Sequence, residues 1–492
     1  MSDREQEARR ERLAKLRAAG IEPYPARVGP RTPIAELRRL HDAKDVERLA
    51  AEASRAAIAG RVRARRSFGK LLFLTLVEDG AALQVSARKG ETDPETFAFL
   101  GDVDVGDFIR VEGTLWRTQK GELTLGANGA QLLAKALRPL PEKWHGLADV
   151  EARYRQRHLD LLANERTREI ALLRSRTLRA LRAFLDARGF LEVETPVLQP
   201  LYGGAAARPF TTHHQLFDQP LYLRISDELY LKRLVIGGLD RVYEIGHNFR
   251  NEGISHKHSP EFTMLECYQA YADYTNMMEL VQALLCATAQ EVLGSLSVPY
   301  GTGAIELGGV WRRVTMRDAL HEATGVDILE ATDLASLRRA LAAAGIEPGE
   351  APTWAQLVDE VFSAKVEPGL VQPTFVTHHP TELSPLAKRA PEDPRLVERF
   401  ELFVAGMELA NAFSELNDPD DQRARFEEQR RLAAAGDAEA HPLDEDFLAA
   451  LEQGMPPTGG LGVGVDRFVR VLADAPNLRE VILFPHLRPE KS

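Results

Sequence analysis

The chain has 492 residues, about three times the usual length of one domain, so we expect two or three domains. Hydrophobic residues make up 44% and charged residues 27% of the chain, which excludes a low-complexity or wholly disordered protein. The net charge of -11 excludes a surface that is basic throughout, although it leaves room for a local basic patch.

Cysteine content and hydropathy indicate the compartment. The two cysteines, Cys267 and Cys286, are too few for a disulfide framework and lack the spacing of a zinc site. The N-terminal segment is charged rather than apolar, and no stretch approaches 18 consecutive apolar residues. We therefore expect a cytoplasmic protein with no signal peptide and no membrane contact.

Residues 1–55 are predicted to form a helical extension. Arg, Glu and Ala dominate this segment, and Leu13, Leu16 and Leu37 stand among charged residues at helical spacing. A basic run over residues 9–17 suits either an RNA backbone or a solvated helix face, and the sequence leaves both readings open.

Residues 56–140 are predicted to form a small β-barrel. Five short strand-like runs are separated by turns, as in an OB-fold, which commonly binds single-stranded nucleic acid by aromatic stacking and cationic grooves. Phe73 lies among basic residues of the first two strands, which are Arg61, Arg63, Arg65, Arg66 and Lys70. The alternative is that Phe73 is core and the arginines only keep an edge soluble.

A proline-containing linker over 141–150 should separate the barrel from a second domain over 151–492. In that domain an apolar stripe predicts a helix over 167–188, with Gly189 at its C-cap, followed by a strand. Strands and helices then follow without a βαβ rhythm, which favours an α+β fold with an antiparallel sheet flanked by helices. Residues 315–365 read as a helical insertion in this sheet.

Residues 241–271 read as strand, polar loop, strand. In the second strand, alternation places Phe262, Glu266 and Tyr268 on one face together with Met264. A buried Glu266 requires a cation or a changed protonation state. Arg250 suits a carboxylate or a phosphate because its guanidinium binds both in a bidentate manner, although an internal salt bridge is the alternative.

Residues 399–418 read as a hairpin with a turn at Ala405 and Gly406. This turn makes Glu401 and Glu408 diagonal neighbours, and such like charges favour a shared cation, for which magnesium is suited. Asn411, Phe413 and Glu415 also alternate, but with parity opposite to that of Glu408. A bulge near Ala410 is therefore required to bring both sets into one pocket.

Residues 458–472 form a glycine-dense run that leads into an apolar helix. Gly460, Gly462 and Gly464 allow the backbone to approach a ligand closely. Arg467 in the first helical turn suits a phosphate tail. No upstream βαβ unit is present, so the run is not a dinucleotide-binding fingerprint.

Three of these segments resemble motifs 1, 2 and 3 of the class II aminoacyl-tRNA synthetases: FLEVETPVLQP, FRNEG through EFTMLECYQAY, and GLGVGVDR. Within that class, further segments resemble the bacterial-type lysyl-tRNA synthetase family of subclass IIb: GGAAARPF at 203–210, ELYLKRL at 228–234, FRNEGIS at 249–255 and FSELND at 413–418. The resemblance covers nearly the whole chain. Departures from the family pattern occur at Gly246, His247, Ala410 and Ala412, and none removes a ligand.

The resemblance implies ATP-dependent attachment of L-lysine to the 3′ end of tRNA(Lys) through a lysyl-adenylate, with release of pyrophosphate and AMP. It implies ATP as a substrate and two or three Mg²⁺ ions. It further implies an OB-fold anticodon-binding domain, a class II catalytic domain, and a homodimer that buries residues near 178–200. Neither chemical step requires a side-chain nucleophile, so catalysis should consist of positioning and charge stabilisation.

The resemblance also assigns residues by position. For ATP it implies Arg250, Glu252, His258, Phe262, Glu401 and Arg467, of which Arg250 and Arg467 are catalytic. For Mg²⁺ it implies Glu401 and Glu408. For lysine it implies Gly204, Glu228, Arg250, Glu266, Tyr268, Asn411, Phe413 and Glu415. For the anticodon it implies Arg66, Phe73 and Gln84.

Three alternatives stay open at this point. An aspartyl- or asparaginyl-tRNA synthetase shares both domains but should place positive charge at the substrate side chain, whereas this pocket is acidic. An enzyme that attaches a lysine-type group to an elongation factor should lack the N-terminal barrel. A non-enzymatic protein that binds single-stranded RNA would not need Arg250, Glu401, Glu408 or Arg467.

Overall fold

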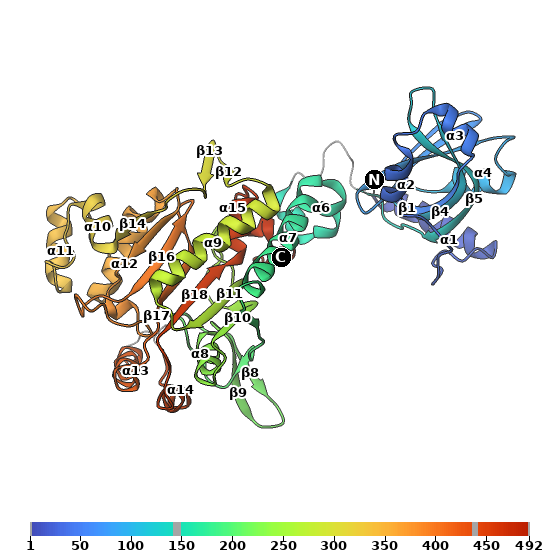
Figure 1. Cartoon of the computed structure of the whole chain (residues 1–492). Helices are drawn as coiled ribbons and strands as arrows, with labels where there is room; N and C mark the ends of the chain where they lie inside the picture. Colours follow the sequence, from blue (N-terminus) through green and yellow to red (C-terminus); the bar gives the residue numbers. More distant parts are fainter. Residues whose placement is uncertain (1, 141–148, 435–440, 491–492) are drawn as a thin grey trace. The chain divides into compact units, whose positions relative to one another are not determined.

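The computed structural model describes residues 2–140, 149–434 and 441–490 (Figure 1). The chain divides into two compact units, Met1–Ala148 and Asp149–Ser492. Most of the predicted linker, residues 141–148, lies outside the described residues, and Val150 already belongs to a helix. Among the described helices, none combines the length and the apolar character needed to cross a membrane.

The first unit contains the predicted five-stranded barrel, which is closed and has the strand order β1-β2-β3-β5-β4. Its strands are β1 Arg55–Phe68, β2 Leu71–Glu78, β3 Ala81–Arg88, β4 Phe108–Arg117 and β5 Leu123–Ala134. Side chains on alternate positions fill the interior, as Leu72, Leu74 and Leu76 of β2 do. The prediction of an OB-type barrel is confirmed.

Four helices accompany the barrel: α1 Ser2–Ala18, α2 Ile34–His41, α3 Val46–Glu52 and α4 Pro94–Asp102. Ile34, Leu37 and Leu49 of α2 and α3 join the core of the barrel. The helices α3 and α4 begin at Asp45 and Asp93, whose side chains accept hydrogen bonds from backbone N–H groups of the first turn.

The second unit is built on an eight-stranded sheet in the order β14-β15-β16-β17-β18-β11-β10-β6. Its strands are β6 Leu191–Glu192, β10 Arg241–Phe249, β11 Glu261–Ala270, β14 Arg312–Thr315, β15 Thr374–Thr377, β16 Arg399–Val404, β17 Met407–Ser414 and β18 Thr458–Gly464. The six inner strands are antiparallel, as predicted. The two edge strands are parallel to their neighbours, β14 to β15 and β6 to β10. The sheet is therefore mixed at its edges.

Helices cover one face of this sheet, and α9 lies against β16, β17 and β18 (Figure 1). The main core joins the sheet to α7 Glu165–Asp186, α9 Tyr274–Leu293 and α15 Val465–Leu472. The predicted stripe of α7 is buried at Ile170, Leu181 and Leu185, and Gly189 after the helix has a φ of 75°.

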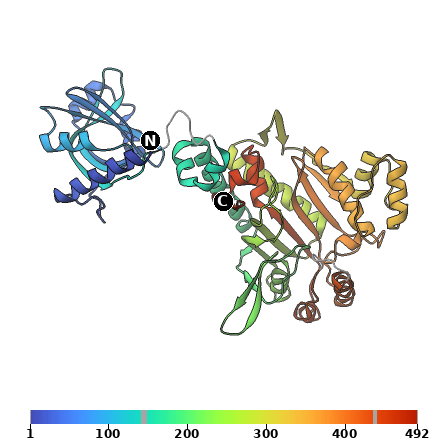
Figure 2. The ribbon, with the colours of Figure 1, turned by 180° about the vertical axis from the view of Figure 1, so that it is seen from behind.

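The remaining elements surround the sheet (Figure 2). Helices α10 Met316–Thr324, α11 Leu334–Ala343 and α12 Trp354–Lys365 lie between β14 and β15 in the sequence and have their own core. The other helices are α5 Val150–Arg155, α6 Arg157–Ala163, α8 Glu228–Ile236, α13 Pro419–Ala434, α14 Glu445–Leu451 and α16 Leu478–Val481. Two small sheets contain β7 Leu198–Gln199, β8 Thr211–His214 and β9 Gln219–Leu223, and β12 Ser297–Tyr300 and β13 Gly303–Glu306. The described part of the unit also contains two 3-10 turns, Glu367–Gly369 and Thr381–Leu383.

Candidate active site

A cavity of about 1350 Å³ lies on the sheet face that the main core does not occupy. Its lining comes from β11, β16, β17 and β18, from α8, α12 and α13, and from the loop after β10. Every residue predicted to bind ATP, lysine or metal lines this one cavity: Gly204, Glu228, Arg250, Glu252, His258, Phe262, Glu266, Tyr268, Glu401, Glu408, Asn411, Phe413, Glu415 and Arg467. The structure thus brings together side chains that the sequence separates by more than 250 positions.

Alternation along β11 places three of these residues. Phe262, Glu266 and Tyr268 line the cavity, while Leu265 and Cys267 between them pack in the core on the other face. The predicted parity of this strand is confirmed.

A β-bulge places the residues of the hairpin. Phe403 pairs with Glu408 and Leu402 pairs with Ala410, so Leu409 is an extra residue on β17. The predicted turn and the required bulge are both present, and the bulge brings Glu408 and Asn411 to the same cavity despite their opposite parity.

Arg250 is available for an anionic ligand. Its guanidinium carbon lies 5.1 Å from the centroid of the Phe262 ring, and its Nε is buried without a hydrogen-bond partner. Within the described ranges Arg250 makes no ion pair closer than 4.0 Å, which argues against the internal salt bridge considered as an alternative. Burial lowers the pKa of Arg250, and an anion would remove this penalty.

Arg467 and His258 lie beside Arg250 in the cavity lining. Arg467 Nη1 donates to the backbone oxygen of Glu408 at 2.6 Å and to Glu408 Oε2 at 3.1 Å. Burial and the nearby charges of Arg467 and Lys257 lower the pKa of His258 to about 4, so its imidazole is neutral at pH 7. This end of the cavity therefore offers two guanidinium groups and a neutral ring to a polyanion.

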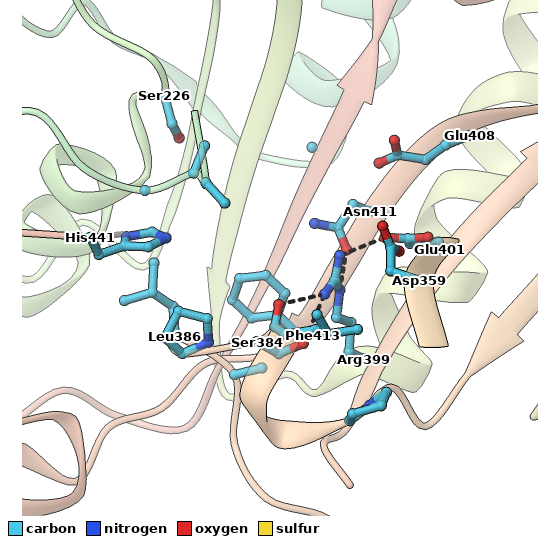
Figure 3. Close-up of a pocket in the computed structure, with 18 of the residues that line it drawn as sticks. Ser226, Asp359, Ser384, Leu386, Arg399, Glu401, Glu408, Asn411, Phe413 and His441 are labelled. Atoms are coloured by element: carbon cyan, nitrogen blue, oxygen red, sulfur yellow. Dashed lines mark hydrogen bonds and ion pairs between the residues drawn. The ribbon is translucent and has the colours of Figure 1, made fainter. Parts of the chain in front are cut away.

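Glu401 is held by two residues that the sequence analysis did not single out. Arg399 Nη2 lies 2.5 Å from Glu401 Oε1, and His379 Nε2 lies 3.6 Å from Glu401 Oε2. Burial opposes ionisation of Glu401, but Arg399 and His379 outweigh it and lower the pKa of Glu401 to about 2. Figure 3 shows Arg399 also reaching Asn411 and Ser384, at 2.9 Å and 2.8 Å.

The donor set near Glu401 fits a magnesium ion that is shared with a ligand. The described part of the chain contains no group of three or more His, Cys, Asp or Glu side chains that could hold a metal ion. Mg²⁺ is commonly bound by one or two carboxylates together with substrate phosphates. Glu401 and Glu408 supply two carboxylates and leave the other positions to phosphate oxygens and water.

A buried lysine that the sequence analysis missed pairs with two acids of the cavity lining. Lys232 is 0% exposed, lies 2.5 Å from Glu228 Oε1 and also forms an ion pair with Glu415. Lys232 therefore neutralises part of the charge of the pocket that the sequence analysis describes as acidic. The signal was present in ELYLKRL, because Glu228 and Lys232 are four residues apart on one helix.

Two hydroxyl groups donate hydrogen bonds to Glu266. Its Oε1 accepts a hydrogen bond from Ser226 Oγ at 3.0 Å and its Oε2 accepts one from the Tyr268 hydroxyl at 3.3 Å. Glu415 Oε1, on the side away from Lys232, has no hydrogen-bond partner among the described residues. The carboxyl group of Glu266 and the Oε1 atom of Glu415 thus stay available to a ligand at this end of the cavity.

Glycines make the space for this pocket. Gly204 has a φ of 85°, and a Cβ there would lie 2.8 Å from Ser226 Oγ. A Cβ on Gly460 would overlap Glu415 Oε1 and the Tyr268 ring. The departure at Gly246 has a similar explanation, because a Cβ there would overlap the guanidinium of Arg224.

The three predicted anticodon residues lie on neighbouring barrel strands, in the other unit. Arg66 on β1 pairs with Phe73 on β2, and Gln84 on β3 donates to Thr124 Oγ1 at 2.9 Å. Phe73 is half-buried and is not part of the barrel core. Phe68, which the sequence analysis did not select, is 64% exposed and lies edge-on to Phe73, with ring centroids 6.5 Å apart.

Comparison with known proteins decides the family. A model of class II tRNA synthetases (D, K and N) matches residues 149–488. The chain belongs to the class II tRNA synthetase family. A second model, of the OB-fold nucleic acid binding domain, matches residues 56–133. Both units of this synthetase thus have a matching model.

Relatives of this class II synthetase span its full length. The lysine--tRNA ligase of Roseiflexus castenholzii is 53% identical, with 99% of each chain covered. The lysine--tRNA ligase of Carboxydothermus hydrogenoformans is 50% identical, with 98% of this chain and 97% of that protein covered. The lysine--tRNA ligase of Chloroflexus aurantiacus is 51% identical, with 98% of each chain covered.

Proposed function

We propose that this synthetase attaches L-lysine to the 3′ end of tRNA(Lys), using ATP and forming a lysyl-adenylate, with release of pyrophosphate and AMP. The observation that carries the proposal is an acidic pocket around Glu266 and Glu415 in the same cavity as Arg250 and Arg467. The names of the full-length relatives support the same reaction.

In the first step the lysine carboxylate attacks the α-phosphorus of ATP and pyrophosphate leaves. Arg250 is the residue best suited to bind the carboxylate and the α-phosphate together, since it is half-buried and has no internal acid partner among the described residues. Arg467 then holds the γ-phosphate, while Glu252, His258 and Phe262 surround the adenine end. These groups stabilise charge in the transition state, as expected for phosphoryl chemistry without an enzyme nucleophile.

In the second step the 3′-hydroxyl of the terminal tRNA adenosine attacks the carbonyl carbon of the adenylate, and AMP leaves. No covalent bond to the enzyme forms in either step. Magnesium, in two or three ions, would neutralise the phosphates when bound. Glu401 and Glu408 would hold it, and Arg399 and His379 keep Glu401 ionised and oriented.

Selection of lysine follows from charge. Glu266, Tyr268 and Glu415 receive the ε-ammonium, Gly204 and Glu228 receive the α-amino group, Asn411 receives the carboxylate, and Phe413 lines the stem. A substrate without a side-chain cation leaves buried acids unpaired, an arrangement that discriminates by about 10⁴-fold or more. Aspartate would add a carboxylate to this pocket, which argues against an aspartyl- or asparaginyl-tRNA synthetase.

The other two alternatives are also disfavoured. The enzyme that modifies an elongation factor should lack the barrel, which is present here. A protein that only binds RNA needs no cavity lined by paired arginines and carboxylates.

Two further features support the proposal for the whole molecule. Leu191, Val197 and Leu198 are 51%, 41% and 48% exposed, and a second copy of the chain would bury them in a homodimer. Light scattering should then give the molar mass of two chains.

Both cysteines are free thiols, which supports a cytoplasmic location.

We assign anticodon recognition to Arg66, Phe73 and Gln84, with Phe73 stacking on a base. Phe73→Ala should raise the KM for tRNA(Lys) by about 5- to 150-fold, the equivalent of about 1–3 kcal/mol of stacking. Pyrophosphate exchange without tRNA should not change, because Phe73 lies in the other unit from the cavity. Phe73→Tyr keeps a stacking ring and serves as the control, and equal losses in both reactions would contradict this division of labour.

The direct test of the reaction is charging of a tRNA(Lys) transcript by the purified protein with ATP and Mg²⁺. Labelled lysine should appear on the transcript in an alkali-labile ester, and labelled aspartate and asparagine should not. Charging of an aspartate or asparagine transcript with its own amino acid instead would refute the proposal.

A further inference from the structure

Two buried carboxyl groups lie next to each other at the amino-acid end of the cavity. Asp227, immediately before α8, is 1% exposed, and Glu266, in the middle of β11, is 4% exposed. Their side chains are within hydrogen-bonding reach of each other. Glu266 lines the cavity and Asp227 does not, so Asp227 lies behind Glu266 as seen from the ligand.

The hydrogen bonds around the pair come from neutral donors. Asn248 Nδ2 donates to Asp227 Oδ1 at 3.1 Å, and Ser226 Oγ donates to Glu266 Oε1 at 3.0 Å. Asp227 Oδ2 is buried and has no donor among the residues that the structure describes. Two ionised carboxylates in contact repel each other, whereas a single proton between them forms a hydrogen bond and satisfies that oxygen.

The charged groups that face the pair do not neutralise it. Lys232 on α8 is paired with Glu228 and Glu415, and Arg224 Nη1 lies 2.5 Å from Glu244 Oε1. Arg250 also acts on Glu266. Among the described residues it has no acid partner of its own, and it lies too far from Glu266 to form an ion pair. Burial first, and then Asp227, raise the pKa of Glu266 well above its usual range.

We propose that Asp227 and Glu266 share one proton in the empty site, and that the side-chain ammonium of the substrate displaces this proton to solvent. The inference rests on the proposed function. The bond that breaks is the O–H bond between the two carboxyls, and the new contact is a charge-assisted hydrogen bond from the ammonium to Glu266. Asp227 is a positioning residue, because it acts on the substrate through Glu266.

A defined pH dependence follows. At a pH below the raised pKa of Glu266, lysine must expel a proton in order to bind, so its affinity is reduced. The KM for lysine should therefore fall as pH rises, by up to about tenfold per pH unit where the pair holds a full proton. The KM for ATP should not show this slope, because the pair does not line the nucleotide end.

The experiment is calorimetric titration of L-lysine into the full-length protein at pH 7 in two buffers that differ in ionisation enthalpy. The wild-type protein should release at least about half a proton per lysine bound. Asp227→Asn keeps an acceptor for Asn248 and offers an amide N–H to Glu266, so Glu266 should ionise in the empty site and proton release should fall to less than about half of the wild-type value. Asp444→Asn is the matched control, since Asp444 pairs with Arg233 of α8 outside the cavity and should leave the release unchanged.

A second variant keeps the inference falsifiable if Asp227→Asn is poorly folded. Ser226→Ala removes a donor to ionised Glu266, so the rise of lysine affinity with pH should extend to higher pH. Absence of proton release from the wild-type protein, or equal release by Asp227→Asn, would overturn the inference. Lysine-dependent pyrophosphate exchange separates the proposed function from the shared proton. Absence of exchange refutes the proposed function, whereas normal exchange without proton release refutes only the shared proton.

Discussion

Arg250→Ala should lower lysine-dependent exchange of pyrophosphate into ATP by at least about 10³-fold, the scale on which a single arginine acts in phosphoryl transfer. The reason is that Arg250 is the cavity cation without an internal acid partner among the described residues, and the proposed reaction assigns it to the carboxylate and the α-phosphate. Its guanidinium would hold both anions in one plane, so its loss should affect orientation as well as charge.

The fold of this variant should be intact. Because the Arg250 guanidinium is desolvated without an ion pair, it destabilises the ligand-free folded protein. Its removal should therefore leave the thermal unfolding midpoint unchanged or slightly higher. Arg250→Lys is the control for charge alone, and it should recover little of the exchange because an ammonium lacks the planar fork. Exchange within a few-fold of wild type in Arg250→Ala would remove Arg250 from the chemistry.

Lys232→Met should give the largest loss of stability. The substitution keeps a long linear side chain but leaves Glu228 and Glu415 buried without their cation, a change that typically costs about 3–5 kcal/mol. Lysine binding should be lost at the same time, since Lys232 forms ion pairs with Glu228 and Glu415, which both line the cavity. Urea unfolding at pH 7 measures the first effect, and lysine titration measures the second.

The pH dependence of this variant identifies the cause. Burial raises the pKa of both Glu228 and Glu415, and without Lys232 these pKa values rise further. The carboxyls must then be protonated in the folded state, so the stability deficit should be smaller at pH 5 than at pH 8. Lys388→Met, at an exposed lysine whose side chain donates to Asn417 Oδ1, should change stability by less than about 0.5 kcal/mol. A deficit in Lys232→Met that is the same at both pH values would indicate lost packing instead of unpaired acids.

Local patterns in the sequence determine much of this site. Alternation along residues 262–268 is enough to place Phe262 and Glu266 on the ligand face, because a strand allows only two faces. The turn at Ala405 and Gly406, with positive φ at both residues, fixes the register that pairs Phe403 with Glu408. The need for both Glu408 and Asn411 in one pocket then implies the bulge at Leu409.

Other features depend on contacts that no local pattern contains. Arg399 joins Glu401, Asn411 and Ser384 through the fold of the hairpin and the loop before it, so a charge count along the chain cannot assign its partners. The contact between Asp227 and Glu266 joins a helix start to the middle of a strand that lies some 40 positions later. The parallel pairing of β14 with β15 and of β6 with β10 at the sheet edges likewise depends on the long connections between strands.

Amino-acid-dependent pyrophosphate exchange across a panel of amino acids tests the central claim most directly, which is that an acidic pocket beside a nucleotide site selects a long cationic substrate. The panel should include lysine, ornithine, arginine, methionine, aspartate and asparagine. Lysine should support exchange, and methionine, of similar length but without charge, should do so at least about 10⁴-fold less efficiently in kcat/KM. Exchange supported by aspartate or asparagine but not by lysine would contradict the account.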